Sequence, residues 1–157
     1  MAEGTASHRR LASVLVRESR ESDIPSCLEI QRSEGNPLFS FQDFGTMVRD
    51  PDCIFQVFEL KGRVVGFIAG FLVPTKRSEA IIHATMVHRD FRHRGIGKFL
   101  VESFAVTAFD KHGVGAILAQ VESGPDAFYG KCRFGKEAVW NSMVLRRESF
   151  MTGGPPP

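Results

Sequence analysis

Cysteine is scarce in this chain of 157 residues, and its three positions are widely separated. Cys27, Cys53 and Cys132 form no C-x-x-C pair, and an odd number of cysteines cannot complete a disulfide framework. The sequence therefore favours neither a zinc site nor a fold held together by disulfides. We expect reduced, buried thiols and no metal site.

Long apolar runs are absent as well. The longest, from Val64 to Val73, contains two glycines and reaches about half of the roughly 20 residues that a membrane-spanning helix needs. The first ten residues hold no apolar stretch of the kind found in secretory signals. We therefore expect a cytoplasmic protein without a membrane partner.

Neither sign of charge is in large excess. The 20 Lys and Arg residues against 18 Asp and Glu residues give a net charge of +2, too little to predict a nucleic-acid partner. Fourteen phenylalanines and 43% hydrophobic residues can supply an ordinary core. This length and composition predict a single domain over residues 11–148, between loose ends at 1–10 and 149–157.

The spacing of apolar residues predicts the order β-α-α-β-β-β-α-β-α-β. Hairpins come first and crossover helices later, so the expected fold is α/β, with flanking helices and a mixed, mostly antiparallel sheet. The expected strands are 13–17, 53–60, 63–73, 80–88, 115–122 and 138–145, and the expected helices are 24–35, 40–48, 98–112 and 126–132. Asp23 is expected to cap the first helix.

A basic, glycine-containing loop joins the strand at 80–88 to the following helix. Gly95 and Gly97 allow a tight turn and a close approach to a ligand, and N–H groups at a helix start favour an anion. Arg92, Arg94 and Lys98 add positive charge. The loop lacks the ending of a nucleotide P-loop. It predicts a di- or polyphosphate site, and a plain turn carrying surface arginines is the alternative.

Two motifs of this chain resemble the GNAT superfamily of N-acetyltransferases. The run from Arg92 to Gly97 matches the Q/R-x-x-G-x-G/A loop that binds the pyrophosphate of acyl-CoA. The run from Phe128 to Gly135 is similar to the later F-Y-x-x-x-G-F segment, although Arg133 replaces the glycine of its G-F pair. The order of the elements also resembles that fold from about residue 13 to residue 145.

A second, narrower resemblance covers residues 83–92. This run is similar to the corresponding segment of arylalkylamine N-acetyltransferases. In those enzymes a second histidine stands two positions earlier, where this chain has Ile81.

The resemblance implies an enzyme that transfers the acetyl group of acetyl-CoA to an amine by direct attack in a ternary complex. A splayed cleft in the sheet would admit the pantetheine arm beside Met86 and Val87, and an N–H group near Met86 would polarise the thioester carbonyl. Tyr129 would protonate the departing thiolate. A homodimer is also common in this family. The residues implied in cofactor binding are Met86, Val87, Arg92, His93, Arg94, Gly95, Ile96, Gly97 and Lys98.

Removal of the proton from the amine has two candidate bases, with water as the alternative. His83 lies two residues before Thr85 and, in a regular strand, on the same face, and an imidazole accepts protons near neutral pH. Glu122 ends the neighbouring expected strand. Each has a structural alternative, a satisfied or solvent-facing histidine and a solvated carboxylate, just as Tyr129 has the alternative of a core aromatic.

Two classes of acceptor stay open: small primary amines, which include arylalkylamines, polyamines and amino acids, and the N-termini or lysines of proteins. A module that binds acyl-CoA without catalysis is another hypothesis, but Tyr129 and the intact loop argue against it. A nucleic-acid binder built on the basic loop is the weakest hypothesis, because the net charge is small.

Overall fold

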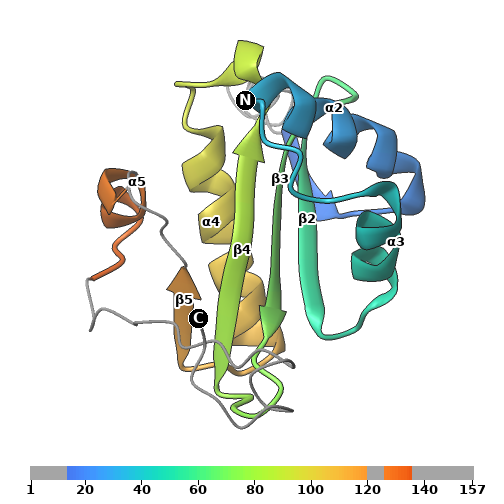
Figure 1. The fold of residues 1–157 in the computed structure, drawn as a ribbon. Coiled ribbons are helices and arrows are strands. Elements are labelled where there is room, and N and C mark those ends of the chain that lie inside the picture. Colours follow the sequence, from blue (N-terminus) through green and yellow to red (C-terminus); the bar gives the residue numbers. More distant parts are fainter. Residues whose placement is uncertain (1–13, 120–125, 136–157) are drawn as a thin grey trace, which may run out of the picture.

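A five-stranded sheet in the order β1-β2-β3-β4-β5 forms the centre of the protein (Figure 1). This computed structural model describes residues 14–119 and 126–135. Neighbouring strands are antiparallel from β1 to β4, and β5 runs parallel to β4. The strands are β1 (Val14–Glu18), β2 (Cys53–Leu60), β3 (Arg63–Leu72), β4 (Glu79–Val87) and β5 (Ala116–Ala119). The predicted mixed, mostly antiparallel sheet is confirmed.

Helices cover both faces of the sheet (Figure 1). On one face lie α2 (Ile24–Glu34) and α3 (Phe41–Arg49), and on the other lies α4 (Ile96–Val106), which continues as the π-helical turn η3 (Thr107–Lys111). The shorter elements are η1 (Glu21–Asp23), η2 (Arg89–Phe91) and α5 (Asp126–Lys131). The predicted order is confirmed as far as α5, and the strand expected at 138–145 lies outside the described residues.

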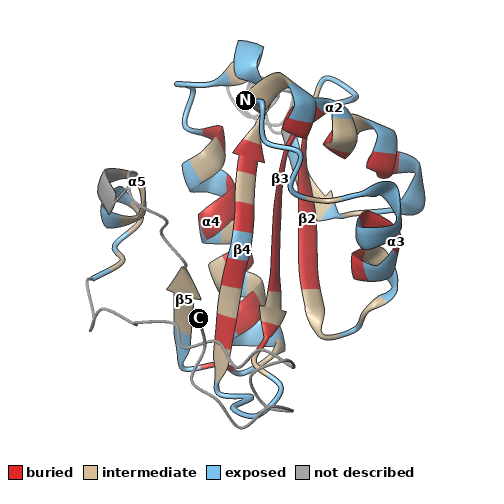
Figure 2. Ribbon diagram, in the orientation of Figure 1, coloured by how far each residue is buried: buried red, intermediate tan, exposed pale blue. Residues whose placement is uncertain are grey.

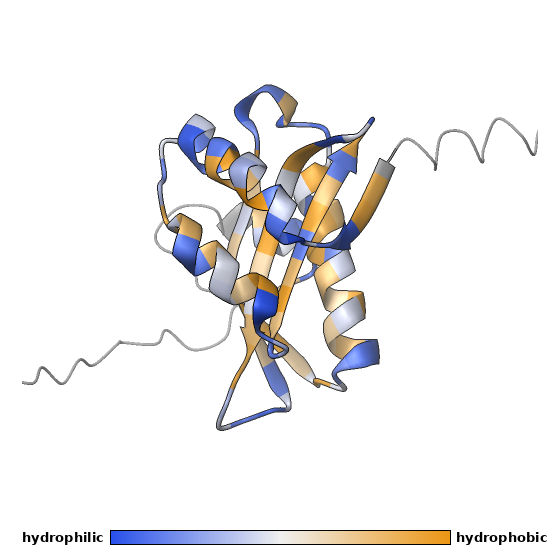
Figure 3. Ribbon diagram, turned by 90° about the vertical axis from the view of Figure 1, so that its right-hand side faces the viewer, coloured by the Kyte–Doolittle hydropathy of each residue, from blue (hydrophilic) through white to orange (hydrophobic). Residues whose placement is uncertain are grey.

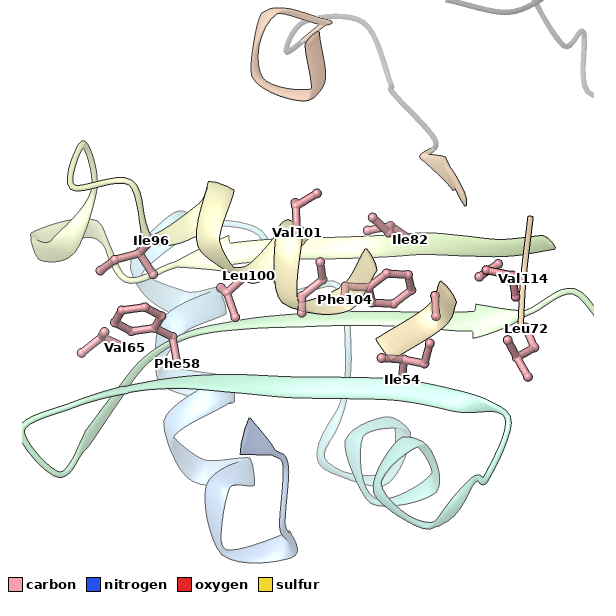
Figure 4. Packing of buried hydrophobic residues seen from close by; sticks show 13 residues of the cluster. Ile54, Phe58, Val65, Leu72, Ile82, Ile96, Leu100, Val101, Phe104 and Val114 are labelled. Carbon is pink, nitrogen blue, oxygen red and sulfur yellow. The ribbon is translucent and has the colours of Figure 1, made fainter. Parts of the chain in front are cut away.

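Two hydrophobic clusters hold the layers together. Figure 3 shows strands that are mostly hydrophobic, between helices that carry hydrophobic and hydrophilic residues side by side, and Figure 2 shows the buried residues concentrated in β2, β3 and β4. The cluster beneath α4 includes Phe58, Ile68, Leu100 and Phe104 (Figure 4). In the cluster beneath α2 and α3, the ring of Phe44 contacts three other phenylalanine rings at centroid distances of 5.4–5.6 Å.

Residues at the helix ends explain where α2 and α3 begin and stop. Gly35 ends α2 with a left-handed φ of 69°, and the Ser40 hydroxyl caps α3 by accepting the Asp43 N–H at 3.1 Å. Asp23 occupies the N-cap position of α2, as predicted, but its side chain makes no capping hydrogen bond to the helix. Its carboxylate instead accepts from Arg17 and from the Arg20 N–H, so it joins β1 to the helical layer.

A β-bulge at His83 decides which side chains of β4 face which helix. Ala84 pairs with Ala69 but Ile82 pairs with Gly70, so one residue of β4 is extra. Before the bulge, Ile82 belongs to the cluster beneath α4, whereas after it Met86 belongs to the cluster beneath α2 and α3. Even-numbered residues of β4 therefore face α4 before the bulge and face α2 and α3 after it.

The bulge also corrects the predicted placement of His83. The His83 ring packs edge-on against Phe71 at 5.3 Å, on the α2–α3 face, while Thr85 lies on the α4 face with Val87. His83 and Thr85 therefore do not share a face, because the extra residue breaks the two-residue repeat that the prediction assumed.

The irregular pairing also depends on the close approach of β4 and α4 to Gly70 on β3. A Cβ built at this residue would lie 2.4 Å from the Ile81 carbonyl oxygen and 2.7 Å from the Phe104 ring. Both neighbours are fixed, since Ile81 contributes backbone and Phe104 is fully buried. Only glycine fits between β4 and α4 at this point.

Gly70→Ala should lower the free energy of unfolding by about 1–3 kcal/mol, because the added methyl group overpacks the sheet. The measurement is urea unfolding followed by circular dichroism. Gly115→Ala is the matched control, since a Cβ there meets only the Ser78 carbonyl oxygen at 3.9 Å. Equal unfolding midpoints for the two variants would contradict this account of Gly70.

Candidate functional site

The loop between β4 and α4 contains two residues with left-handed backbone. His93 has a φ of 62° and Gly95 a φ of 79°. A Cβ at Gly95 would meet no atom within 4 Å, so glycine suits this position through its backbone conformation and not through lack of space. The turn delivers the chain directly into α4 at Ile96.

The N-terminus of α4 has no side-chain cap. Gly95 occupies the N-cap position, and no side chain of the described residues accepts a hydrogen bond from the first turn. The N–H groups of Ile96, Gly97 and Lys98 are therefore available to a ligand, and the helix dipole adds positive potential. The Ile96 side chain is buried beneath the helix, so this residue can offer only its backbone.

The three cations of the loop differ in their surroundings. Arg92 forms an ion pair with Glu34, its Nε donating to Oε1 at 2.5 Å, which ties the loop to the end of α2. Arg94 and Lys98 are exposed beside the start of α4. Lys98 lies 3.8 Å from the Glu102 carboxylate one turn along α4, whereas Arg94 lies over the Phe91 ring and has no carboxylate partner within the described residues. The Arg92–Glu34 pair was not predicted, because the two residues are 58 positions apart in the sequence.

Beyond the bulge, the β5 side of β4 has no partner strand among residues 14–119 and 126–135, and we call this stretch, from His83 to Val87, the open edge. The last described pair of the parallel β4–β5 ladder joins Ile82 and Ala119. The His88 N–H donates to the Val65 carbonyl on β3 at 2.7 Å. Main-chain groups alternate in direction along an antiparallel strand.

This alternation identifies which main-chain groups face the open edge. Met86 turns its N–H and C=O toward β3, as His88 does, and Thr85 and Val87 turn theirs toward the open edge. The Met86 side chain is buried beneath α2 and α3, and the Val87 side chain packs beneath α4. An extended ligand could therefore pair with β4 on both sides of Met86.

Tyr129 reaches the α4 side of this open edge from α5. Its ring lies between Phe128 and Phe134, at centroid distances of 5.1 and 5.3 Å. Burial raises the pKa of Tyr129, and the neighbouring Thr85 side chain lowers it in part. Arg133 holds a left-handed φ of 67° just after the helix, so the turn forms although arginine replaces the expected glycine.

Gly97 couples the loop to α5. A Cβ at Gly97 would lie 3.2 Å from the Phe128 ring, closer than an ordinary packing contact. The absence of a side chain at Gly97 therefore lets α5 pack on the first turn of α4, next to Tyr129. The sequence predicted a tight turn and close approach to a ligand at this glycine but not the packing of α5, because that packing is a tertiary contact.

His83 lies on the opposite face of β4 from Tyr129. Its side chain is exposed, and partial loss of solvation lowers its pKa, so the imidazole stays neutral at a lower pH than a free histidine. Glu122, the other candidate base, lies outside the described residues. The base candidate His83 and the acid candidate Tyr129 thus lie on opposite faces of β4, with Tyr129 reaching its face from α5.

Among residues 14–119 and 126–135, no three His, Cys, Asp or Glu side chains gather as a metal site. In that same part of the chain, no helix combines the length and apolar character needed to cross a bilayer.

Known structures share this fold. Ard1 from Thermoplasma volcanium is 26% identical with a TM-score of 0.70, and the alignment covers 80% of this chain and 85% of that one. An aminoglycoside acetyltransferase from an uncultured soil metagenomic sample, in complex with sisomicin, is 17% identical with a TM-score of 0.66, covering 86% and 98%. A ribosomal-protein-alanine N-acetyltransferase from Brucella melitensis biovar Abortus 2308 is 19% identical with a TM-score of 0.65, covering 85% and 98%.

The sequence itself matches one family over most of its length. No curated protein matches the chain significantly. The sequence model of the acetyltransferase (GNAT) family, however, matches residues 15–134, a range that includes the sheet, the loop before α4 and Tyr129. The chain therefore belongs to the GNAT family of acetyltransferases.

Proposed function

We propose that this acetyltransferase moves the acetyl group of acetyl-CoA to a small primary amine by direct attack in a ternary complex. The observation that carries the proposal is the continuity of the open edge of β4 with the uncapped N-terminus of α4. An extended thioester arm paired with Thr85 and Val87 would lead to its own pyrophosphate at the loop, which suits the shape and charge of acetyl-CoA.

The loop would hold the cofactor mainly through its backbone. The N–H groups from His93 to Lys98 would donate to the pyrophosphate, with Arg94 and Lys98 supplying nearby positive charge. Arg92 would act differently, because its pair with Glu34 fixes the loop against α2. A main-chain N–H on the open edge would polarise the thioester carbonyl.

The two faces of β4 would divide the proton transfers. On the α2–α3 face, neutral His83 would take the proton from the amine as its nitrogen attacks the carbonyl carbon, with Glu122 or water as the alternative base. On the α4 face, the carbon–sulfur bond breaks and Tyr129 would give its proton to the thiolate. The products would be the acetylated amine and free CoA.

The cysteines support direct transfer rather than an acyl-enzyme. Burial raises the pKa of both Cys27 and Cys53 to about 12, so these thiols stay protonated at neutral pH. Burial also raises the pKa of Cys132. None of these thiols has the thiolate character of a cysteine nucleophile.

A protein acceptor is the second candidate, because the chain is also similar to a ribosomal-protein-alanine N-acetyltransferase. Release of free CoA should be followed with two panels at matched concentrations, one of amines and amino sugars and one of short peptides with free N-termini. A preference for peptides, measured as kcat/KM, would replace the small-amine proposal.

Calorimetric titration tests the cofactor first. Acetyl-CoA and CoA should bind, whereas ATP, which lacks the pantetheine arm, should not bind comparably. Equal binding of ATP would contradict the role of the β4 edge. Binding without transfer to either acceptor panel would favour an acyl-CoA-binding module.

Gly95→Glu should weaken acetyl-CoA binding by at least about tenfold, because a carboxylate then faces the pyrophosphate at the helix start. Gly113→Glu is the matched control, since Gly113 also has a positive φ, 66°, and open space. It stands about 25 Å away along α4 and η3. Equal loss of affinity in both variants would show that strain or net charge, and not the loop, is responsible.

Tyr129→Phe should lower kcat by roughly 100-fold, because it removes the acid that protonates the thiolate. The acetyl-CoA dissociation constant should stay near that of the unmodified protein, since the ring keeps its contacts with Phe128 and Phe134. Steady-state kinetics and calorimetry measure the two quantities. An unchanged kcat would remove Tyr129 from the mechanism.

His83→Gln should lower the rate by roughly 100-fold at pH values where His83 is neutral. Its pKa is lowered, so the neutral, active form persists to below about pH 6.5 and is lost as the pH falls further. The ratio of the unmodified rate to the His83→Gln rate should therefore fall toward one in acid. This ratio cancels the ionisation of the amine itself.

His112→Gln is the control, because this histidine follows η3 at the far end of α4. Its ratio should be near one at every pH. A ratio near one for His83→Gln as well would assign the proton to water or to Glu122.

A further inference from the structure

The Thr85 hydroxyl is an unexplained polar group at the centre of the site. Its Oγ1 atom is buried and has no hydrogen-bond partner among the described residues. A buried hydroxyl without a partner is unfavourable and calls for an explanation in the functional state. A lone threonine in a strand could satisfy itself at a backbone carbonyl, but this one does not.

Its position gives the explanation. Thr85 lies past the last β4–β5 pair, and the bulge at His83 turns its side chain toward α4. Tyr129 approaches the same spot from α5, close enough for the Thr85 side chain to affect its ionisation. The two hydroxyls do not complete a hydrogen bond in the present arrangement.

We propose that Thr85 is a positioning residue that donates a hydrogen bond to the Tyr129 oxygen as this tyrosine loses its proton during acetyl transfer. The inference rests on the proposed function, because it takes Tyr129 as the acid. It goes beyond that function by assigning a partner to the acid. The threonine side chain was implied in neither cofactor binding nor catalysis by the sequence.

In this step the carbon–sulfur bond breaks and the sulfur takes the proton from Tyr129. The phenolate oxygen that results accepts a hydrogen bond from the Thr85 hydroxyl, which keeps its proton. Water then returns a proton to the phenolate. A donor aimed at the charged oxygen makes tyrosine a stronger acid, which opposes the rise in its pKa caused by burial.

Among the described residues, no other group near Tyr129 supplies this donor. Cys132 faces it from the turn after α5 and itself has a pKa raised by burial. Lys98 and Glu102 of α4 act on Cys132 with opposite signs. On the α4 face of β4, the other side chains near Thr85 are the apolar Ile82 and Val87.

The single tyrosine of the chain makes a direct test possible. Tyr129 is the only tyrosine, so the ultraviolet absorbance of tyrosinate reports on this residue alone, and Tyr129→Phe provides the blank. Thr85→Val keeps the shape and removes the hydroxyl. It should raise the pKa of Tyr129 by about one unit, as expected for loss of a hydrogen bond to a charged oxygen.

Thr85→Ser should restore the titration, and Thr85→Ala is a second hydroxyl-free variant in case valine disturbs the packing. Circular dichroism at each pH confirms that the protein stays folded. Identical titration curves for the unmodified protein and both hydroxyl-free variants would overturn the proposal.

Kinetics separate positioning from a merely structural role. Thr85→Val should lower kcat by about tenfold, the equivalent of one unit of pKa, with little change in the KM for acetyl-CoA. In the Tyr129→Phe background it should cause no further loss, and an equal loss in that background would overturn the proposal. A shifted titration in a protein that acetylates no acceptor would leave the Thr85–Tyr129 pair standing and remove the proposed function.

Discussion

The extra residue at His83 is the constraint on which the site depends. Without it, the side chains of β4 would alternate regularly, and His83 and Thr85 would face the same helix layer. With it, His83 lies against Phe71 on one face while Thr85 meets Tyr129 on the other. Within the described residues, the last β4–β5 pair lies just before the bulge, so the open edge begins where the side chains of β4 change face. Gly70 on β3 supports this geometry, since a side chain there would collide with the Ile81 carbonyl of β4 and the Phe104 ring of α4.

The two glycines of the loop have different physical reasons. Gly95 supplies a left-handed backbone in open space, which points the first N–H groups of α4 outward. Gly97 supplies room, because the Phe128 ring packs where its Cβ would be. The spacing of the motif therefore has two consequences: it shapes the proposed anion site, and it lets α5 pack so that Tyr129 comes near the open edge. A substitution at Gly97 would disturb Tyr129 even if the anion site kept its shape.

The sequence predicts those features that depend on short-range patterns. Apolar spacing located the described strands and helices within a few residues, and the predicted helix limits at residues 35 and 40 coincide with the caps Gly35 and Ser40. Features that depend on contacts between distant segments were not predictable. The bulge at His83 and the pair of Arg92 with Glu34 arise from packing across the fold. The capping by Asp23 failed for the same reason, because Arg17 on β1 competes for its carboxylate.

Burial shifts the pKa values of the two proposed proton carriers in opposite directions, and each shift favours the neutral form. Loss of solvation lowers the pKa of His83, so more of it is in the neutral form that can accept a proton. Burial raises the pKa of Tyr129, which keeps the phenol protonated at neutral pH and also makes it a weaker acid toward the thiolate. Loss of solvation favours the neutral form of each side chain. The neutral form is the deprotonated one in histidine and the protonated one in tyrosine, so the two residues are left ready to accept and to donate a proton. Separation of two pKa values by environment is the usual way in which one site supports both an acid and a base at neutral pH. Too large a rise would make Tyr129 a poor donor, and a hydroxyl from Thr85 at the phenolate oxygen limits that rise at the point where the thiolate departs.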